Sequence, residues 1–259
     1  MHPMLNIGVR AARRAGDIIV RSLDRVADLR VETKAGNDFV SEVDREAERA
    51  IIETIRRSYP DHAFLGEESG KSGHSEFEWI IDPLDGTTNF LHGFPVFAVS
   101  IALRVKGRIE HGVIYDPLRQ ELFTASRGSG AQLDGRRLRV SKCRELSTAL
   151  LGTGFPYRDQ DDLDKYMATF RVMTRQSRGI RRAGSAALDL AYVAAGRLDG
   201  FWEFNLQLWD IAAGVLMIHE AGGLTGSPSG GTNHLETGNV LAANPKLFAE
   251  MAKVLKPLV

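Results

Sequence analysis

The spacing of apolar side chains along the first half of the chain predicts two helices followed by a series of strands. Residues 4–23 and 41–58 have apolar side chains at helical spacing, and Pro60 ends the second helix because proline cannot continue its hydrogen-bond ladder. Residues 26–31 are expected to form a short strand or an extended connector, and residues 69–76 a mobile loop. Short apolar runs predict strands at 62–66, 79–81, 96–105, 108–115 and 121–125.

The pattern changes near residues 140–142, after which strands and helices alternate. Strands are predicted at 149–152, 179–181, 200–203 and 238–243, and helices at 163–174, 184–195, 209–221 and 245–255. We therefore expect an α/β (α+β) protein. Residues 1–142 would form an N-terminal α+β domain with an antiparallel sheet, and residues 143–259 a C-terminal α/β domain.

Composition narrows the class of protein. Hydrophobic residues make up 43% of the 259 residues and charged residues 25%, which is typical of a globular chain. Lysine plus arginine and aspartate plus glutamate both number 33, so charge alone does not favour nucleic-acid binding. A single cysteine, Cys143, excludes an internal disulfide and a cysteine-based zinc site. No apolar run reaches the ~18 residues of a membrane span, so we expect a cytoplasmic protein without membrane association.

The residues from Trp79 to Phe90 read W-I-I-D-P-L-D-G-T-T-N-F and concentrate the candidate chemistry. Asp82 directly follows the apolar run 79–81. Pro83 is expected to break the strand, and Asp85 comes two residues after it. Two carboxylates crowded at a strand end repel each other unless a cation or a proton separates them, and hard oxygen ligands suit Mg²⁺ or Mn²⁺. The Gly-Thr-Thr that follows could begin a helix that binds an anion, or could be a plainly capped helix.

The spacing of the two aspartates distinguishes between phosphatase chemistries. Haloacid dehalogenase phosphatases use D-x-D-G-T, in which both aspartates share one strand face. The present motif is D-x-x-D-G-T, with Pro83 between Asp82 and Asp85. A covalent aspartyl-phosphate mechanism is therefore disfavoured.

Two further acidic positions follow the same design. Glu67 and Glu68 come directly after the apolar run 62–66, and Asp210 follows Trp209 at the start of a predicted helix, where an ordinary helix cap is the alternative. Three acidic clusters at the ends of elements are the kind of set that assembles a site for two or three metal ions.

Together these segments resemble the inositol monophosphatase family of lithium-sensitive, magnesium-dependent phosphatases, and its bacterial SuhB-like branch in particular. The resemblance rests on G-E-E at 66–68, the motif at 79–90, L-W-D-I-A-A-G at 208–214 and the run R-R-A-G-S-A-A-L-D-L-A-Y-V-A-A-G-R-L-D-G-F-W-E at 181–203. It covers essentially the whole chain. It implies a layered αβαβα sandwich of the inositol monophosphatase and fructose-1,6-bisphosphatase type.

The resemblance implies a set of ligands for two or three Mg²⁺ ions per site, with Mn²⁺ possible. The first ion would be held by Glu67, Asp82 and the backbone carbonyl of Leu84. The second would be held by Asp82, Asp85 and Asp210, so that Asp82 bridges the two. A third, weaker ion would use Glu67 and water. The C-terminal domain would thus contribute Asp210 to a site otherwise built by the N-terminal domain.

The resemblance also implies roles around the substrate. The N–H groups of Gly86 and Thr87 would contact the phosphate. Ala186 and Glu203, beside Asp85 and Asp210, would contact the hydroxyls of a small polyol. Glu67 and Thr87, the latter held by Asp44, would orient and deprotonate the attacking water, and Lys34 would support the metal loop.

The implied reaction is the hydrolysis of inositol 1-phosphate to inositol and phosphate, by a homodimer. Relatives within the superfamily act instead on fructose 1,6-bisphosphate, NADP or 3′-phosphoadenosine nucleotides. A role of a different class is also open, because SuhB-branch proteins are partners of the transcription machinery, including the antitermination factor NusA. Four arginines could form a basic surface for such a partner, or could simply be solvated or face a dimer partner: Arg178, Arg181, Arg182 and Arg197.

Overall fold

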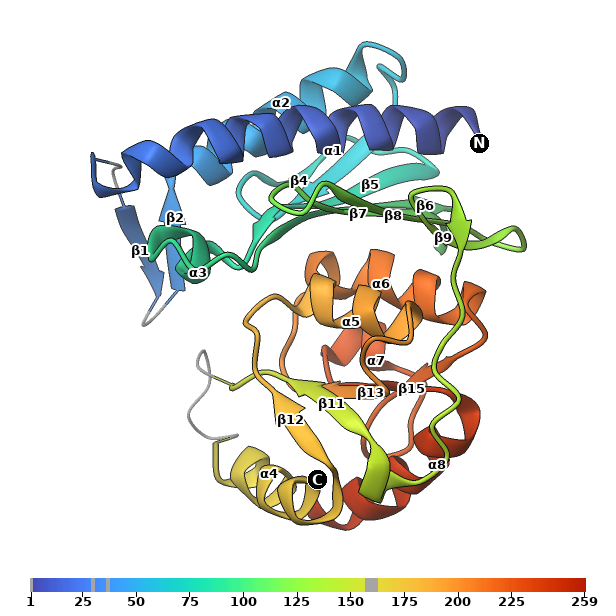
Figure 1. Ribbon diagram of the computed structural model, residues 1–259. Helices are drawn as coiled ribbons and strands as arrows, with labels where there is room; N and C mark the ends of the chain where they lie inside the picture. The colour runs from blue at the N-terminus through green and yellow to red at the C-terminus, as the bar shows by residue number, and fades with distance from the viewer. Residues whose placement is uncertain (1, 29–30, 36–37, 157–162) are drawn as a thin grey trace.

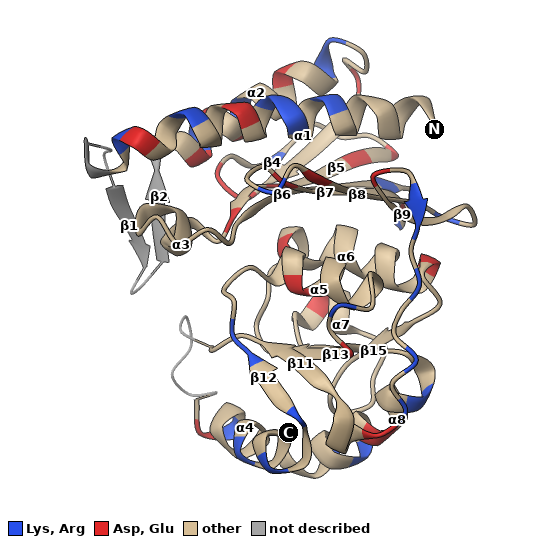
Figure 2. Ribbon diagram, viewed as in Figure 1, with Lys and Arg blue, Asp and Glu red and all other residues tan. Residues whose placement is uncertain are grey.

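The computed structural model describes residues 2–28, 31–35, 38–156 and 163–259. Five layers follow one another in Figure 1: a helical pair, a large sheet, a second helical pair, a smaller sheet and a last pair of helices. The predicted αβαβα sandwich is therefore confirmed. Charged residues mark the outer helices, whereas the two helices of the middle layer are mostly uncharged because a sheet covers them on each side (Figure 2).

The first layer consists of α1 (Pro3–Ser22) and α2 (Glu42–Arg56). Both have one apolar face, which packs on the large sheet, and both agree with the predicted helices to within a few residues. A strand or extended connector was expected at 26–31: residues 26–28 instead belong to a 3₁₀ segment, η1 (Leu23–Asp28), residues 29–30 lie outside the described residues, and Val31 begins a strand. The 3₁₀ segment is followed by the antiparallel hairpin of β1 (Val31–Ala35) and β2 (Asp38–Ser41).

The large sheet has the strand order β10-β9-β8-β7-β6-β5-β3-β4. Its strands are β3 (Ala63–Gly66), β4 (Gly70–Ser72), β5 (Phe77–Asp85), β6 (Ala98–Val105), β7 (Arg108–Asp116), β8 (Glu121–Ser126), β9 (Gly130–Leu133) and β10 (Arg136–Arg137). All neighbouring pairs are antiparallel except β3 and β5, which are parallel. The segment predicted as a mobile loop contains β4, which extends the sheet beyond β3.

Pro83 does not break the strand, contrary to the sequence-based expectation. Strand β5 continues to Asp85, and its pairing with β6 shifts register between Asp82 and Asp85. Asp82 lies opposite Ser100 and Asp85 opposite Ala98, so three steps on β5 match two on β6. This is a β-bulge, and a bulge accommodates a proline because one ladder hydrogen bond is already missing there. The short helix α3 (Thr87–Leu91) follows at once.

The second half forms a five-stranded mixed sheet with the order β12-β11-β13-β15-β14. Its strands are β11 (Leu150–Thr153), β12 (Gly179–Arg181), β13 (Gly200–Glu203), β14 (Leu224–Gly226) and β15 (Val240–Ala243). Its helices are η2 (Leu146–Thr148), α4 (Leu163–Gln176), α5 (Ala186–Ala194), α6 (Leu208–Glu220), α7 (His234–Thr237), α8 (Pro245–Leu255) and η4 (Lys256–Leu258).

Helices α5 and α6 form the middle layer and join the two halves. Glycines allow α6 to lie close to both β7 and α5. A Cβ on Gly112 of β7 would lie 3.1 Å from Ala213 of α6, and a Cβ on Gly214 of α6 would lie 2.5 Å from the Leu190 side chain of α5. The two sheets lie on opposite sides of residue 142 in the sequence, but the division into domains there stays a prediction. Among the described residues, no helix has the length and apolar character of a membrane span.

Candidate metal and phosphate site

The parallel pairing of β3 with β5 brings two of the predicted acidic residues together. Gly66 lies opposite Ile81, and the backbone N–H of Glu67 donates to the Ile81 carbonyl oxygen at 3.0 Å. The next residues along the two strands, Glu67 and Asp82, therefore leave the same edge of the sheet. Their carboxyl groups lie within hydrogen-bonding reach, and Asp82 is only 2% exposed.

The bulge brings Asp85 to the same side. Residues three apart on a regular strand point to opposite faces, and one extra residue reverses this. Asp85 Oδ2 accepts hydrogen bonds from Ser185 Oγ at 2.5 Å and from the Ala187 N–H at 2.7 Å, which places it at the start of α5. Asp85 thus links the large sheet to the second half of the chain, and the amide dipoles of α5 favour its negative charge.

Asp210 reaches the cluster from α6. It occupies the third position of that helix and forms a capping box with Gln207, whose backbone N–H donates to Asp210 Oδ2 at 2.8 Å. Asp210 thus takes part in a helix cap, as in the alternative interpretation, but the N-cap residue itself is Gln207. The cap does not exclude a ligand role, because the Asp210 side chain is buried and its charge acts on both Asp82 and Asp85.

The negative charges of the carboxylates in this cluster repel one another. Burial, followed by Glu67, Asp85 and Asp210, raises the pKa of Asp82 well above the ordinary value. Burial, followed by Asp210, raises the pKa of Asp85 to about 7, although the bonds from Ser185 and Ala187 act in the other direction. Without a cation, Asp82 and Asp85 therefore keep their protons to higher pH than ordinary aspartates do.

This repulsion makes a prediction for the metal-free protein. Because the folded pKa values of Asp82 and Asp85 exceed those of the unfolded chain, the folded state binds more protons, and stability falls as pH rises. The melting temperature of the metal-free protein should therefore decrease from about pH 4 through about pH 7. Millimolar Mg²⁺ should restore it at pH 8 far more than at pH 5. Calorimetry at matched ionic strength measures both effects, and equal Mg²⁺ shifts at the two pH values would contradict the prediction.

Thr87 lies beside the cluster, at the start of α3. Its hydroxyl is 2.9 Å from Asp44 Oδ1 and 3.1 Å from the Leu84 carbonyl oxygen, and it can donate its proton to either acceptor. Asp44 is fully buried on α2, so the predicted contact between Asp44 and Thr87 is present. Gly86 has φ of 96°, and a Cβ there would lie 2.9 Å from the Val96 carbonyl oxygen. Only glycine is tolerated at this point.

Two of the predicted substrate contacts come from the second half of the chain and line the same pocket. Ala186 begins α5, and Glu203, which is 8% exposed, ends β13. Burial, followed by Asp189, raises the pKa of Glu203 well above the ordinary value, whereas Arg182 opposes this. Glu203 packs directly over Gly154, where a Cβ would lie 2.0 Å from Oε1. Lys34 belongs to β1, but its side chain is outside the part of the chain that the structure describes.

Sequence reasoning did not place Asp189 or Arg182 in this pocket, which both of them line; Arg182 was considered only for a basic surface. Asp189 is buried on α5, its Oδ1 has no hydrogen-bond partner among the described residues, and burial followed by Asp85 raises its pKa well above the ordinary value. A lone aspartate inside the apolar run A-A-L-D-L-A-Y was the available signal, since such positions are normally apolar. The Arg182 guanidinium lies over the Phe155 ring, 5.1 Å from its centroid.

A pocket of about 360 Å³ contains every predicted metal ligand and all four predicted substrate contacts that are not ligands. These residues are Glu67, Asp82, Leu84, Asp85, Gly86, Thr87, Ala186, Glu203 and Asp210. Within the described residues, no three His, Cys, Asp or Glu side chains are gathered closely enough to hold an ion as they are arranged. Asp85 and Asp210 instead accept backbone N–H groups at the starts of α5 and α6. The donors nevertheless fit a hard divalent cation, because they are carboxylates and a carbonyl whose mutual repulsion a cation would relieve.

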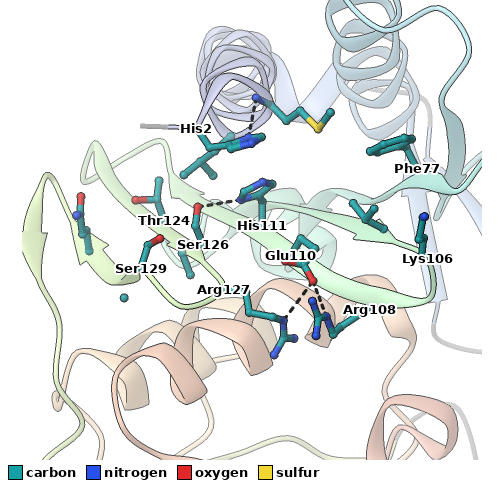
Figure 3. Close-up of a pocket in the computed structure, with 16 residues that line it drawn as sticks. His2, Phe77, Lys106, Arg108, Glu110, His111, Thr124, Ser126, Arg127 and Ser129 are labelled. Carbon is teal, nitrogen blue, oxygen red and sulfur yellow. Dashed lines mark hydrogen bonds and ion pairs between the residues drawn. The ribbon is translucent and has the colours of Figure 1, made fainter.

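A larger cavity of about 1040 Å³ lies elsewhere, over β7, β8 and β9 beside the start of α1 (Figure 3). The His2 and His111 rings stack there with centroids 4.4 Å apart, and His111 Nδ1 lies 2.8 Å from Ser126 Oγ. Of its described lining residues, only Glu110 has a carboxylate, and Arg108 pairs with it at 2.6 Å. The acidic cluster, rather than cavity size, therefore identifies the candidate site.

Comparison with known proteins places the chain in a family. The model of the inositol monophosphatase family matches residues 1–258. The chain belongs to the inositol monophosphatase family. Within this family it falls in the SuhB branch: it is 56% identical to the Nus factor SuhB of Pseudomonas aeruginosa, over 99% of this chain and 97% of that protein.

Solved structures of the family agree with the fold. The extragenic suppressor protein SuhB of Bartonella henselae superimposes with a TM-score of 0.96 at 47% identity, over 98% of this chain and 99% of that one. The inositol monophosphatase of Anabaena sp. PCC 7120 gives a TM-score of 0.85 at 40% identity, over 98% and 95%. The recognition of the family and the inositol monophosphatase type of fold are thereby confirmed.

Proposed function

We propose that this chain hydrolyses phosphate monoesters with Mg²⁺ at the pocket described above, and that inositol 1-phosphate is a substrate. The observation that carries the proposal is the convergence of Glu67 after β3, Asp82 and Asp85 on β5, and Asp210 on α6 in the pocket that Thr87 also lines. A divalent cation bound there would neutralise phosphoryl oxygens and lower the pKa of water.

The chain's own residues would perform the remaining work. Thr87 can donate its proton to Asp44, which leaves its oxygen to accept a hydrogen bond from the attacking water. Glu67, which lines the same pocket as Thr87, would accept the proton of that water. The N–H groups of Gly86 and Thr87 would contact the phosphate. Glu203 and the backbone of Ala186 would hold hydroxyl groups, since a carboxylate binds hydroxyls and repels a second phosphate.

A phosphate-release screen tests this proposal directly. Inositol, sugar and nucleotide phosphates are each incubated with the protein and Mg²⁺, then again with EDTA or with lithium. We expect release from inositol 1-phosphate that EDTA abolishes. Failure to release phosphate from every ester with Mg²⁺ or Mn²⁺ would overturn the proposal.

A second function is supported by a different observation. The P. aeruginosa relative, which matches over nearly its whole length, is named a Nus factor, and this name favours a role in transcription more directly than it favours any particular phosphate ester. We propose that the chain binds the transcription machinery through NusA, and that it does so as a homodimer. Arg197 already pairs with the Glu121 carboxylate at 2.5 Å, so its charge is partly neutralised within such a surface.

Binding to NusA can be separated from hydrolysis. A pull-down with purified NusA is performed with the wild type and with Asp85→Asn, beside light scattering to determine the oligomeric state. Binding that survives loss of hydrolysis would show that the two functions are independent. Absence of binding by the wild-type protein would contradict the second function.

A further inference from the structure

Helix α2 carries two buried carboxylates, Asp44 and Glu48. Asp44 and Glu48 are four residues apart, so they lie on the same face of the helix, and they are 0% and 2% exposed. Asp44 contacts Thr87, as described above. Glu48 is absent from the lining of the pocket, and it contacts neither Thr87 nor the bulge of β5 in any recorded hydrogen bond.

The contacts of Glu48 surround Glu67. Glu48 Oε2 accepts a hydrogen bond from the backbone N–H of Glu68 at 2.9 Å, and Oε1 accepts one from the N–H of Ser69 at 2.8 Å. On the other side of Glu67, Gly66 lies directly against the same carboxylate, and a Cβ there would be 2.4 Å from Oε2. The turn 66–69 is therefore wrapped around one buried carboxylate.

The geometry points to Glu48 as a positioning residue for Glu67, an inference that rests on the proposed function of the pocket. The backbone N–H of Glu67 is held by Ile81, and the two amides that follow are held by Glu48. Hydrogen bonds to an ionised acceptor are roughly twice as strong as neutral ones, and both oxygens are used. With the backbone held on both sides of Glu67, only its side chain can move. That side chain can turn towards Asp82, where the first metal ion is proposed to bind.

The two carboxylates of α2 divide the work of holding the site. Asp44 fixes the hydroxyl of Thr87, and Glu48 fixes the turn that bears Glu67, so both proposed partners of the attacking water depend on one rigid helix. The absence of a side chain at Gly66 is part of the same arrangement, because any Cβ would displace the carboxylate.

The test compares Glu48→Gln with Glu46→Gln, a matched change at an exposed position of the same helix. Glutamine keeps one acceptor oxygen but turns an NH₂ group towards the second backbone N–H, so one bond is lost. Hydrogen exchange of the Glu68 and Ser69 amides in the metal-free protein reports the contact itself. Titration with Mn²⁺, followed by electron paramagnetic resonance, reports ion affinity without any catalytic step.

We expect Glu48→Gln to speed exchange at both amides and to weaken Mn²⁺ binding by about 10- to 100-fold, the usual effect of removing a residue that orients a metal ligand. Its kcat at saturating Mg²⁺ should fall as well, because Glu67 is also the proposed acceptor of the water's proton, and the Mg²⁺ concentration needed for half-maximal rate should rise. A merely structural residue would lower the melting temperature without raising that Mg²⁺ concentration. Glu46→Gln should behave as the wild type in every measurement.

Two outcomes overturn the inference. One is amide exchange and Mn²⁺ affinity in Glu48→Gln equal to those of Glu46→Gln. If Glu48→Gln does not fold, Gly66→Ala takes its place, because this change must displace the same carboxylate. Wild-type affinity of Gly66→Ala for Mn²⁺ is then the second outcome. A wild-type protein that binds no Mn²⁺ would contradict the proposed function instead, and the exchange of the two amides would still decide whether Glu48 holds the turn.

Discussion

Replacing Asp85 with asparagine is expected to lower kcat/KM for phosphate monoesters by at least about 10³-fold while the fold is kept. Asp85 is a proposed metal ligand, and the amide oxygen of asparagine is a neutral and much weaker donor for Mg²⁺. The oxygen can still accept hydrogen bonds from Ser185 Oγ and from the N–H of Ala187. Losing one of several mutually repelling buried charges also offsets part of any cost in stability.

The matched control for this change is Asp116→Asn. Asp116 is 1% exposed and also caps a turn, since Oδ1 accepts from the N–H groups of Leu118 and Arg119, but it lies outside the pocket. This variant should lose stability, because the ion pair with Arg119 is weakened, and should keep its activity. Steady-state kinetics and urea denaturation on both variants make the comparison. Turnover by Asp85→Asn within a few-fold of wild type would remove Asp85 from the proposed site.

Local patterns predicted most of the longer helices and strands but not how the strands pair. The apolar spacing of residues 4–23 and 41–58 predicts α1 and α2 because an amphipathic face must be buried on something. Nothing in residues 62–66 or 79–81 indicates that these strands pair in parallel, since register and direction depend on the rest of the sheet. That pairing is what places Glu67 beside Asp82.

The bulge at Pro83 shows the same limit at a single residue. Proline was expected to end the strand, because it lacks a backbone donor. Within the sheet, β6 continues to pair on both sides of it, and the extra residue turns Asp85 to the side of Asp82. The sequence therefore indicated that Asp82 and Asp85 are candidate ligands. Only the fold explains how two residues three apart come to lie on one face of the strand.

Contacts between distant segments account for the residues that were missed. Ser185 and Ala187 are 100 and 102 residues from Asp85, and Asn89 Nδ2 donates to the Ala183 carbonyl oxygen at 2.9 Å. Glu48 contacts amides 20 and 21 residues away. No periodicity encodes such pairs, because each depends on where two elements meet. Asp189 was the exception, since an aspartate in an apolar helix is visible in the sequence itself.

Replacing Gly238 with alanine is expected to lower the free energy of unfolding by more than about 3 kcal/mol. Gly238 has φ of 69°, and its Cβ would lie 1.9 Å from the carbonyl oxygen and 2.6 Å from the nitrogen of Leu206. Both are backbone atoms, so no side-chain rotation relieves the clash. Residues 205–207 must move, and with them the cap between Gln207 and Asp210.

Gly222→Ala separates the two causes of this loss. Gly222 also has a left-handed backbone, with φ of 88°, but a Cβ there would meet no atom within 4 Å. It should therefore cost only the ~1 kcal/mol of placing an L-residue in that conformation. Urea denaturation of both variants gives the difference, which measures the clash with Leu206. Equal losses would mean that the 205–207 segment yields freely, and Asp210 would then lack the rigid support that a metal ligand requires.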